Sequence, residues 1–332
     1  MEKVSKSKKM LIAIIGLFCF ALPNLIEERF WQNIPVFFRN PGIQTFTIFL
    51  LAIVLEALPF ILIGSVISGV IEVYLPQNKI LGLFQGNRKV VFIPIAALMG
   101  LVMPICECGI VPVVRRLLKK GVPLSIAITY MLTGPIINLT VLASTSLAFW
   151  NKPAVIFWRP VLALLIGVTI GFLSLYFGKE ALATENEHNE YCSSHDLQEK
   201  NWKQVFRHAE TDFFLMGKYL IIGAFAASFI QTVLPRESLL AFNRHLPLSI
   251  LAMIIMAFLL NLCSEADAFV ASTFIQFPAA AKIAFLVSGP MLDLKMVLMW
   301  LAVFRKRFIV FLAAAIVILV FFSTYILGNF LR

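Results

Sequence analysis

The sequence predicts an all-α membrane protein built from an inverted repeat, and three observations support this fold class. Sixty per cent of the 332 residues (60%) are hydrophobic and only 14% are charged, with a mean hydropathy of +0.90. Soluble chains are nearer half apolar and a quarter charged. The apolar residues form runs long enough to cross a bilayer, and motifs of the first half recur in the second. A soluble enzyme, a disulfide scaffold and a disordered chain are therefore excluded.

Nine apolar runs define the candidate membrane elements. Two of them, 90–105 and 248–262, are short enough to be either a span or part of a re-entrant hairpin. The run 43–75 is longer than one span and contains Pro59, which predicts a tilted or kinked helix. The first run follows four lysines as in a signal peptide, but no cleavage site closes it, so we expect an uncleaved helix. The runs are 11–26, 43–75, 90–105, 122–149, 154–177, 212–234, 248–262, 280–303 and 308–330.

The distribution of Lys and Arg distinguishes two topologies. If all nine runs cross from a cytoplasmic N-terminus, 13 basic residues lie inside and 12 outside. If 90–105 and 248–262 are halves of re-entrant hairpins, the count becomes 18 inside and 7 outside. The second topology restores the positive-inside bias. It predicts seven spans, two hairpins, a cytoplasmic N-terminus and an external C-terminus.

Three matches between the halves indicate an internal duplication. Residues 62–76 match 221–235, Cys106 matches Cys263, and 133–139 match 288–294, at offsets of 159, 157 and 155. Each half then contains a helix, a re-entrant hairpin, a broken helix and a helix, with three crossings. Three is odd, so the second copy enters from the opposite side, as in many secondary transporters with a midplane site.

The repeat divides the chain into four predicted parts. They are an N-terminal transmembrane helix with its outer loop (1–42), the first repeat (43–177), a polar cytoplasmic linker (178–210) and the second repeat (211–332).

Gly-Pro pairs predict a helix break in each half. Proline lacks the backbone N–H and favours the first helical position, which predicts half-helices at 122–132 and 135–149, and at 280–288 and 290–303. Such breaks either line a binding site or are packing kinks. Asn138 and Asp293 are candidates for helix capping, for substrate contact, or for both. The candidate substrate-binding residues at the breaks are Thr133, Asn138, Ser288 and Asp293.

Acidic residues outnumber basic ones within the apolar runs and at their ends. Such residues are costly in a membrane and are candidates for function. The excess favours a cationic substrate or a proton relay, with Glu56 or a hairpin-tip carboxylate as the proton carrier. The acids are Glu56, Glu107, Glu265, Asp267 and Asp293, against Arg159, Lys218 and Lys295.

Cysteines next to these acids suggest a soft cation. Cys106 and Cys108 could converge with Cys263 on zinc or another thiophilic metal. Inert packing and thiol redox chemistry are the alternatives. In the linker, His188, Cys192 and His195 would share one helical face and are weaker candidates for a zinc site, because a solvated linker explains them as well.

Several of these motifs resemble those of a known family. Pro104-x-Cys106-x-Cys108-Gly109-x-x-Pro112 and the two Gly-Pro breaks, 133–138 and 288–293, look like the bacterial predicted-permease family, which includes an organoarsenical efflux permease. The resemblance covers roughly 45–330 without the linker. It implies a multi-pass permease of the inner membrane and leaves the substrate open.

The sequence therefore predicts a secondary transporter, not an enzyme, for a small metal cation or metalloid species. Its partners are the lipid bilayer, the ion or metalloid substrate, and either a second copy of the chain or a companion membrane or extracytoplasmic subunit. We expect no cofactor and no nucleic acid, and no nucleotide-binding loop motif occurs. The alternatives are an intramembrane thiol oxidoreductase using Cys106 and Cys108, and a membrane subunit that anchors a partner.

Overall fold

The computed structural model describes residues 40–76, 88–103, 105–177, 181–182, 202–233 and 245–330. Within these ranges the regular structure is helical, and the only strand-like feature is an isolated backbone bridge between Leu182 and Phe304. The predicted all-α class is confirmed. The predicted first helix, 11–26, lies outside the described residues, as does nearly all of the linker.

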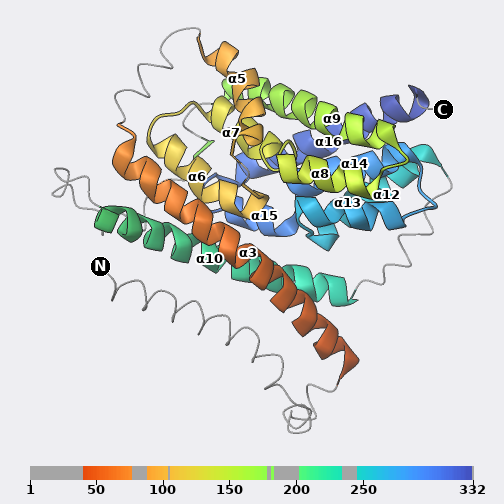
Figure 1. Ribbon diagram of the computed structural model, residues 1–332, viewed down its shortest axis with the longest axis horizontal. Helices are drawn as coiled ribbons and strands as arrows, with labels where there is room; N and C mark the ends of the chain where they lie inside the picture. The colour runs from red at the N-terminus through yellow and green to blue at the C-terminus, as the bar shows by residue number, and fades with distance from the viewer. Residues whose placement is uncertain are drawn as a thin grey trace, which may run out of the picture. The chain divides into compact units, whose positions relative to one another are not determined.

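The helices follow the same order in the two halves of the chain (Figure 1). The first half contains α3 (Pro41–Tyr74), α5 (Arg88–Leu98), α6 (Glu107–Lys119), α7 (Leu124–Thr133), α8 (Leu139–Ala148) and α9 (Pro153–Leu173), with short 3-10 turns at Met99–Leu101 and Ser174–Tyr176. The second half contains α10 (Trp202–Val233), α12 (Leu246–Leu260), α13 (Ser264–Thr273), α14 (Ala279–Met291), α15 (Leu294–Trp300) and α16 (Lys306–Phe330).

Five segments among the described residues are long and apolar enough to cross a membrane. They are α3, α9 with its 3-10 turn, α10, α14 together with α15, and α16. The run 122–149 is not continuous, because it is divided into α7 and α8 of ten residues each. A ten-residue helix is about 15 Å long, roughly half the hydrocarbon core. A break in this run is therefore observed, as predicted.

Packing within the first half is repeated in the second. In the first half α5, α7 and α9 contact one another, and α6 packs on α7. In the second half α12, α14 and α16 contact one another, and α13 packs on α14. These are the helices that the predicted repeat makes equivalent. The inverted orientation of the halves stays a prediction.

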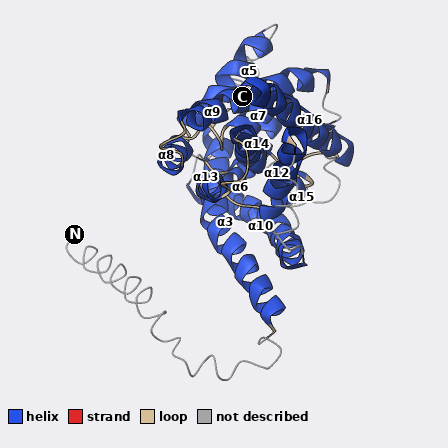
Figure 2. Ribbon diagram, turned by 90° about the vertical axis from the view of Figure 1, so that its right-hand side faces the viewer, coloured by secondary structure: helices blue, strands red, loops and turns tan. Residues whose placement is uncertain are grey.

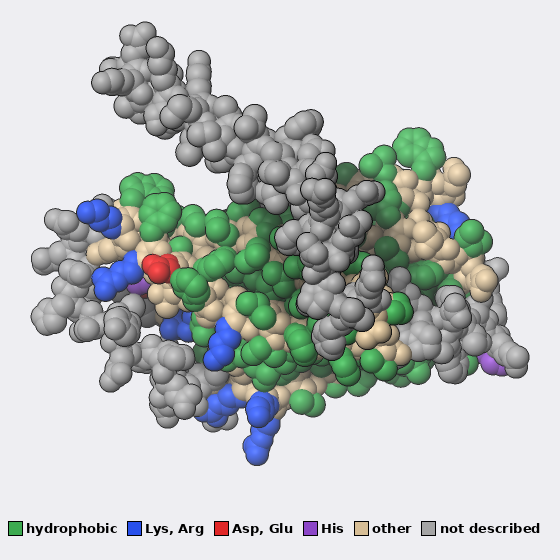
Figure 3. Space-filling model, turned by 90° about the horizontal axis from the view of Figure 1, so that it is seen from below, with side chains coloured by type: hydrophobic (Ala, Val, Ile, Leu, Met, Phe, Trp, Pro, Cys, Tyr) green, Lys and Arg blue, Asp and Glu red, His purple; other side chains and the backbone are tan. Residues whose placement is uncertain are grey.

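Helix α14 forms the centre of the core. Residues Ala280–Met291 are all buried, and α14 packs against α7, α9, α12, α13 and α16, which surround it in Figure 2. Large apolar side chains are instead exposed on outer helices, for example Leu55, Phe214 and Val310, and apolar side chains cover much of the face in Figure 3. An apolar exterior suits contact with lipid, since polar groups are costly there.

The second half-helices begin later than predicted. We expected them to start at Pro135 and Pro290, but α8 starts at Leu139, and α14 continues through Pro290 to Met291. The start of each half-helix is set by a capping side chain instead of a proline. Asn138 accepts a hydrogen bond from the Thr140 N–H at 3.1 Å, and Asp293 accepts one from the Met296 N–H at 2.6 Å, which satisfies N–H groups that lack partners at a helix start. The predicted capping role of both residues is confirmed.

The backbones of α3 and α6 lie in direct contact at two glycines. A Cβ on Gly64 would lie 2.3 Å from the carbonyl oxygen of Gly109, so only glycine fits at this crossing. Small residues allow such close approach between helices in membranes. The contact fixes the start of α6, which carries Glu107, against α3.

Candidate functional site

The two predicted hairpins present acidic groups at equivalent helix starts. In the first half Cys106 is the N-cap of α6 and Glu107 is the first helical residue. In the second half Cys263 is the N-cap of α13, whose first turn contains Glu265 and Asp267. The N-terminal end of a helix carries partial positive charge, which stabilises carboxylates there.

Glu107 meets the broken helix of the second half in a buried ion-pair cluster. The Lys295 Nζ lies 3.0 Å from Glu107 Oε1 and 3.3 Å from Asp293 Oδ2, and the three side chains are at most 3% exposed. Lys295 Nζ also donates to the carbonyl oxygen of Asn261 at 3.4 Å. Three oxygens from different elements therefore surround one ammonium group.

Asn261 connects this cluster to the end of α12. It adopts a left-handed conformation with φ of 48°, which Asn tolerates better than most residues. Its side-chain oxygen accepts a hydrogen bond from the Lys295 backbone N–H at 3.0 Å. Asn261 thus helps to cap α15 while its own carbonyl faces the Lys295 ammonium.

Asp267 and Arg159 extend the buried charge. Asp267 interacts electrostatically with Arg159, and also with Glu107, Asp293 and Lys295. The Arg159 guanidinium donates to Thr145 Oγ1 at 2.5 Å and to the Ser264 carbonyl oxygen at 2.9 Å. A Cβ on Gly289 would lie 2.7 Å from Asp267 Oδ2, so the Gly-Pro pair leaves room for this carboxylate. We call Glu107, Arg159, Asp267, Asp293 and Lys295 the acidic centre.

The other hairpin makes the reciprocal contact with the first half. Thr140 Oγ1 donates to Glu265 Oε1 at 3.0 Å, and the Cys263 thiol donates to Glu265 Oε2 at 3.1 Å. Glu56 of α3 is a further hydrogen-bonding neighbour of Cys263. Helix α6 thus contacts α15, while α13 contacts α8, so each hairpin helix meets the half-helix of the opposite repeat.

Carboxylates exceed cations in the acidic centre, and some of its polar atoms lack partners. Three acids face two bases, and Glu265 and Glu56 add further acid nearby. Among the described residues, buried atoms without a hydrogen-bond partner include Glu107 Oε2, Asp267 Oδ2 and the Arg159 Nε. Buried polar groups are normally paired. The arrangement is therefore suited to receiving a small polar or cationic species.

The whole described fold matches a known family. The profile ArsP_1, described as a predicted permease, matches residues 43–329. The chain belongs to this predicted-permease family. It is 43% identical to UPF0718 protein YcgR of Bacillus subtilis over 284 residues, which cover 85% of this chain and 96% of that protein. The predicted family resemblance is confirmed.

Two further comparisons define how far the similarity reaches. The chain is 38% identical over 272 residues to a Streptococcus mutans protein whose name provisionally assigns it as a subunit of a two-component membrane permease complex; the match covers 80% of this chain and 89% of that protein. No solved structure matches this chain. Membership of the family supports a multi-pass membrane permease, in agreement with the apolar helices.

The predicted site residues divide into two groups. The structure brings Glu107, Asp267 and Asp293 into one centre, and places Glu56, Cys263 and Glu265 together beside it. The Thr133 and Ser288 hydroxyls instead donate to carbonyls of their own helices, Thr129 and Ala284, at 2.8 Å and 2.7 Å. Asn138 acts as a cap. His188, Cys192, His195 and Pro104 lie outside the described residues.

The predicted cysteines are free but do not form a preformed metal centre. Cys106 and Cys108 are buried and Cys263 is partly exposed. Where the structure describes the chain, no group of three or more His, Cys, Asp and Glu side chains has an arrangement that could hold a metal ion. Metal contact by the thiols stays a prediction, and it would require a rearrangement of these side chains.

Sequence reasoning missed the roles of several residues. Lys295 and Arg159 entered only as counterweights to the acids, and neither Thr140 nor Asn261 was identified. One signal was available: the offset of 155 that pairs Asn138 with Asp293 also pairs Thr140 with Lys295. Both members of the second pair contact an acid from a hairpin helix.

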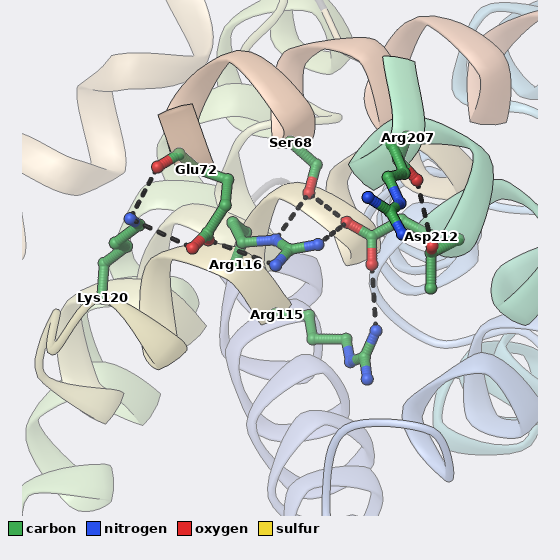
Figure 4. Close-up of polar contacts among 8 residues, drawn as sticks. Ser68, Glu72, Arg115, Arg116, Lys120, Arg207 and Asp212 are labelled. Carbon is green, nitrogen blue, oxygen red and sulfur yellow. Dashed lines mark hydrogen bonds and ion pairs between the residues drawn. The ribbon is translucent and has the colours of Figure 1, made fainter. Parts of the chain in front are cut away.

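A second polar network, also not predicted, joins α3, α6 and α10 (Figure 4). The Arg116 guanidinium lies 2.7 Å from Asp212 Oδ2 and 3.2 Å from Glu72 Oε2. Asp212 also accepts from Ser68 at 2.5 Å and from Arg115 at 3.0 Å. The network places the end of α6 beside the end of α3, as a re-entrant hairpin between them requires.

Proposed function

We propose that this permease is a secondary transporter that moves a small metal cation or metalloid species through the acidic centre. The observation that carries this proposal is the excess of buried carboxylates where a hairpin helix of one repeat meets the broken helix of the other. Buried charge in a membrane is costly and is retained where it serves transport. Non-helical backbone at membrane depth, as at 134–138 and 292–293, is tolerated where it lines a cavity or is buried.

The thiols supply the proposed preference for soft species. Cys106 and Cys108 flank Glu107 at the start of α6, and thiolate with carboxylate favours zinc and other thiophilic metals. Binding would draw these side chains together from their present positions. Glu56, next to Cys263, is our candidate for the coupling proton.

A flux assay tests the proposal. The purified chain, reconstituted into vesicles, is assayed for uptake and efflux with a panel that includes Zn²⁺, Cd²⁺, arsenite and methylarsenite, against protein-free vesicles. We expect flux of at least one soft species, and no flux of Na⁺ or K⁺. Absence of flux for every member of the panel would contradict the proposed substrate class.

Serine variants test the thiols within the same assay. Replacing Cys106 or Cys108 by Ser removes a soft ligand and should reduce flux 5- to 150-fold, which corresponds to about 1–3 kcal/mol by analogy with losing a hydrogen bond to a charged group. Wild-type flux in the Cys106→Ser, Cys108→Ser double variant would assign both cysteines to packing.

We also propose a companion subunit, because the relative from Streptococcus mutans is named as part of a two-component complex. Full flux by the reconstituted chain alone would show that a companion is not needed for transport.

A further inference from the structure

We infer that Lys295 is a tethered cation: its ammonium occupies the position of a substrate cation, and a substrate must displace it to bind. This inference rests on the proposed function, since it concerns the cationic occupant of the same centre. It assigns a role to a residue that the acid and thiol motifs do not include.

The first argument is the coordination around the Lys295 Nζ. Its neighbours are oxygens of Glu107 at 3.0 Å, Asp293 at 3.3 Å and the Asn261 carbonyl at 3.4 Å. Carboxylate and carbonyl oxygens converging on one point are the ligands of hard and borderline cations. The ammonium therefore lies where oxygen ligands from α6, the 292–293 break and the end of α12 converge.

The second argument is that the acids of the centre exceed what Lys295 neutralises. Glu107 Oε2 and Asp267 Oδ2 are buried without a hydrogen-bond partner, and their residues are 1% and 2% exposed. One ammonium cannot pair with all of these oxygens in its present position. An entering divalent cation would supply the charge that the acids lack.

The third argument comes from the repeat. The equivalent of Lys295 in the first half is Thr140, which contacts Glu265 with a neutral hydroxyl. A half-helix of this kind thus forms after a capped break without a lysine at this position. The positive charge of Lys295 is specific to the half whose break carries the acidic cap, Asp293, where the first half has Asn138.

Displacement gives Lys295 a role in returning the empty transporter. With a cation bound, the ammonium must leave the carboxylates; after release, it can neutralise them again, which avoids two uncompensated buried charges. Because the ammonium competes with the substrate, it lowers substrate affinity and allows release. Binding that is favourable but not too tight is what transport requires.

The test measures Zn²⁺ binding by isothermal titration in the purified full-length protein. Lys295→Met removes the competitor and should bind Zn²⁺ at least tenfold more tightly than wild type while Zn²⁺ flux falls. Lys295→Arg keeps the charge and holds carboxylates bidentately, so it should bind Zn²⁺ more weakly. Lys282→Met is the matched control, because Lys282 is another buried lysine of the same repeat outside the acidic centre, and it should bind as wild type does.

The outcomes separate this inference from the proposed function. Unchanged or weaker Zn²⁺ binding by folded Lys295→Met would overturn the tethered cation even if the wild type transports metals. Tighter binding by Lys295→Met in a protein that transports no metal would support the tethered cation and contradict the proposed function. If Lys295→Met does not fold with or without Zn²⁺, Lys295→Arg decides: binding equal to that of wild type overturns the inference, and weaker binding supports it.

Discussion

Asn138 and Asp293 occupy equivalent positions in the two halves and differ by one negative charge. Each is the N-cap of the half-helix that follows the break. Only Asp293 also forms an ion pair, with Lys295 at 3.3 Å. Capping and charge can therefore be separated at this pair of residues.

Asp293→Asn should retain folding and lose transport. Asn and Asp are similar N-caps, so the half-helix should persist, whereas the charge that faces Lys295 and the proposed substrate is removed. We expect a thermally stable protein whose Zn²⁺ flux in vesicles falls at least tenfold, because a ligand of the cation is lost. Asn138→Ala is the control: it removes a cap alone, costs about 0.5–2 kcal/mol of stability, and should retain flux. A fully active Asp293→Asn protein would exclude Asp293 from the site.

The capping residues could be predicted from the sequence, but the partner of Glu107 could not. A polar residue three positions after a Gly-Pro pair indicates a cap through local geometry alone. The Glu107–Lys295 pair joins residues 188 positions apart, and no local pattern specifies which base meets which acid. The excess of acids was visible in the composition, whereas the three-oxygen environment of Lys295 required the fold.

At the scale of elements, the network of Ser68, Glu72, Arg116 and Asp212 holds the end of α6 against α3 and α10. Asp212 is 1% exposed and Glu72 is 26% exposed at the side chain. Removing one partner of a buried pair leaves an uncompensated charge, which costs more than losing an exposed pair. The two acids should therefore differ in their contribution to stability.

Asp212→Asn should destabilise the protein by about 3–5 kcal/mol, because it leaves the buried Arg116 without its closest carboxylate. Glu72→Gln, at the more exposed end of the same network, should cost about 1 kcal/mol or less. Thermal unfolding of the detergent-solubilised variants, followed by circular dichroism, measures both. Equal losses of stability for the two variants would mean that the network does not depend on the buried pair.

The helix breaks show what residue type alone can predict at this scale. Gly-Pro predicted an interruption in each half, and interruptions are present at 134–138 and 292–293. The predicted starts at Pro135 and Pro290 were wrong, because α14 accommodates Pro290 in its last turn and the caps determine where the next helix begins. Proline marks where a hydrogen bond is missing, and the capping side chain determines where hydrogen bonding resumes.

For the whole molecule, two independent patterns led to the same architecture. The charge count favoured two re-entrant hairpins, and the sequence repeat assigned one to each half. The structure adds that equivalent helices pack in equivalent pairs and that each hairpin helix contacts the opposite half. Contacts of this reciprocal kind cannot be derived from a repeat in the sequence, since the repeat specifies which elements correspond and not how the two copies pack.

Membrane orientation is the prediction on which the inverted repeat depends, and single-cysteine labelling tests it. In a Cys-free background, Lys119→Cys and Ser193→Cys should react with a membrane-impermeant thiol reagent only from the cytoplasmic side, because the hairpin topology places 115–120 and 178–210 there with the positive-inside bias. Asn151→Cys, in the exposed turn between α8 and α9, should react only from outside. If all nine runs crossed the membrane, every one of these three sides would be reversed. Labelling of Lys119→Cys and Ser193→Cys from outside, with Asn151→Cys from the cytoplasm, would therefore contradict the hairpins, and with them the odd number of crossings that inverts the second repeat.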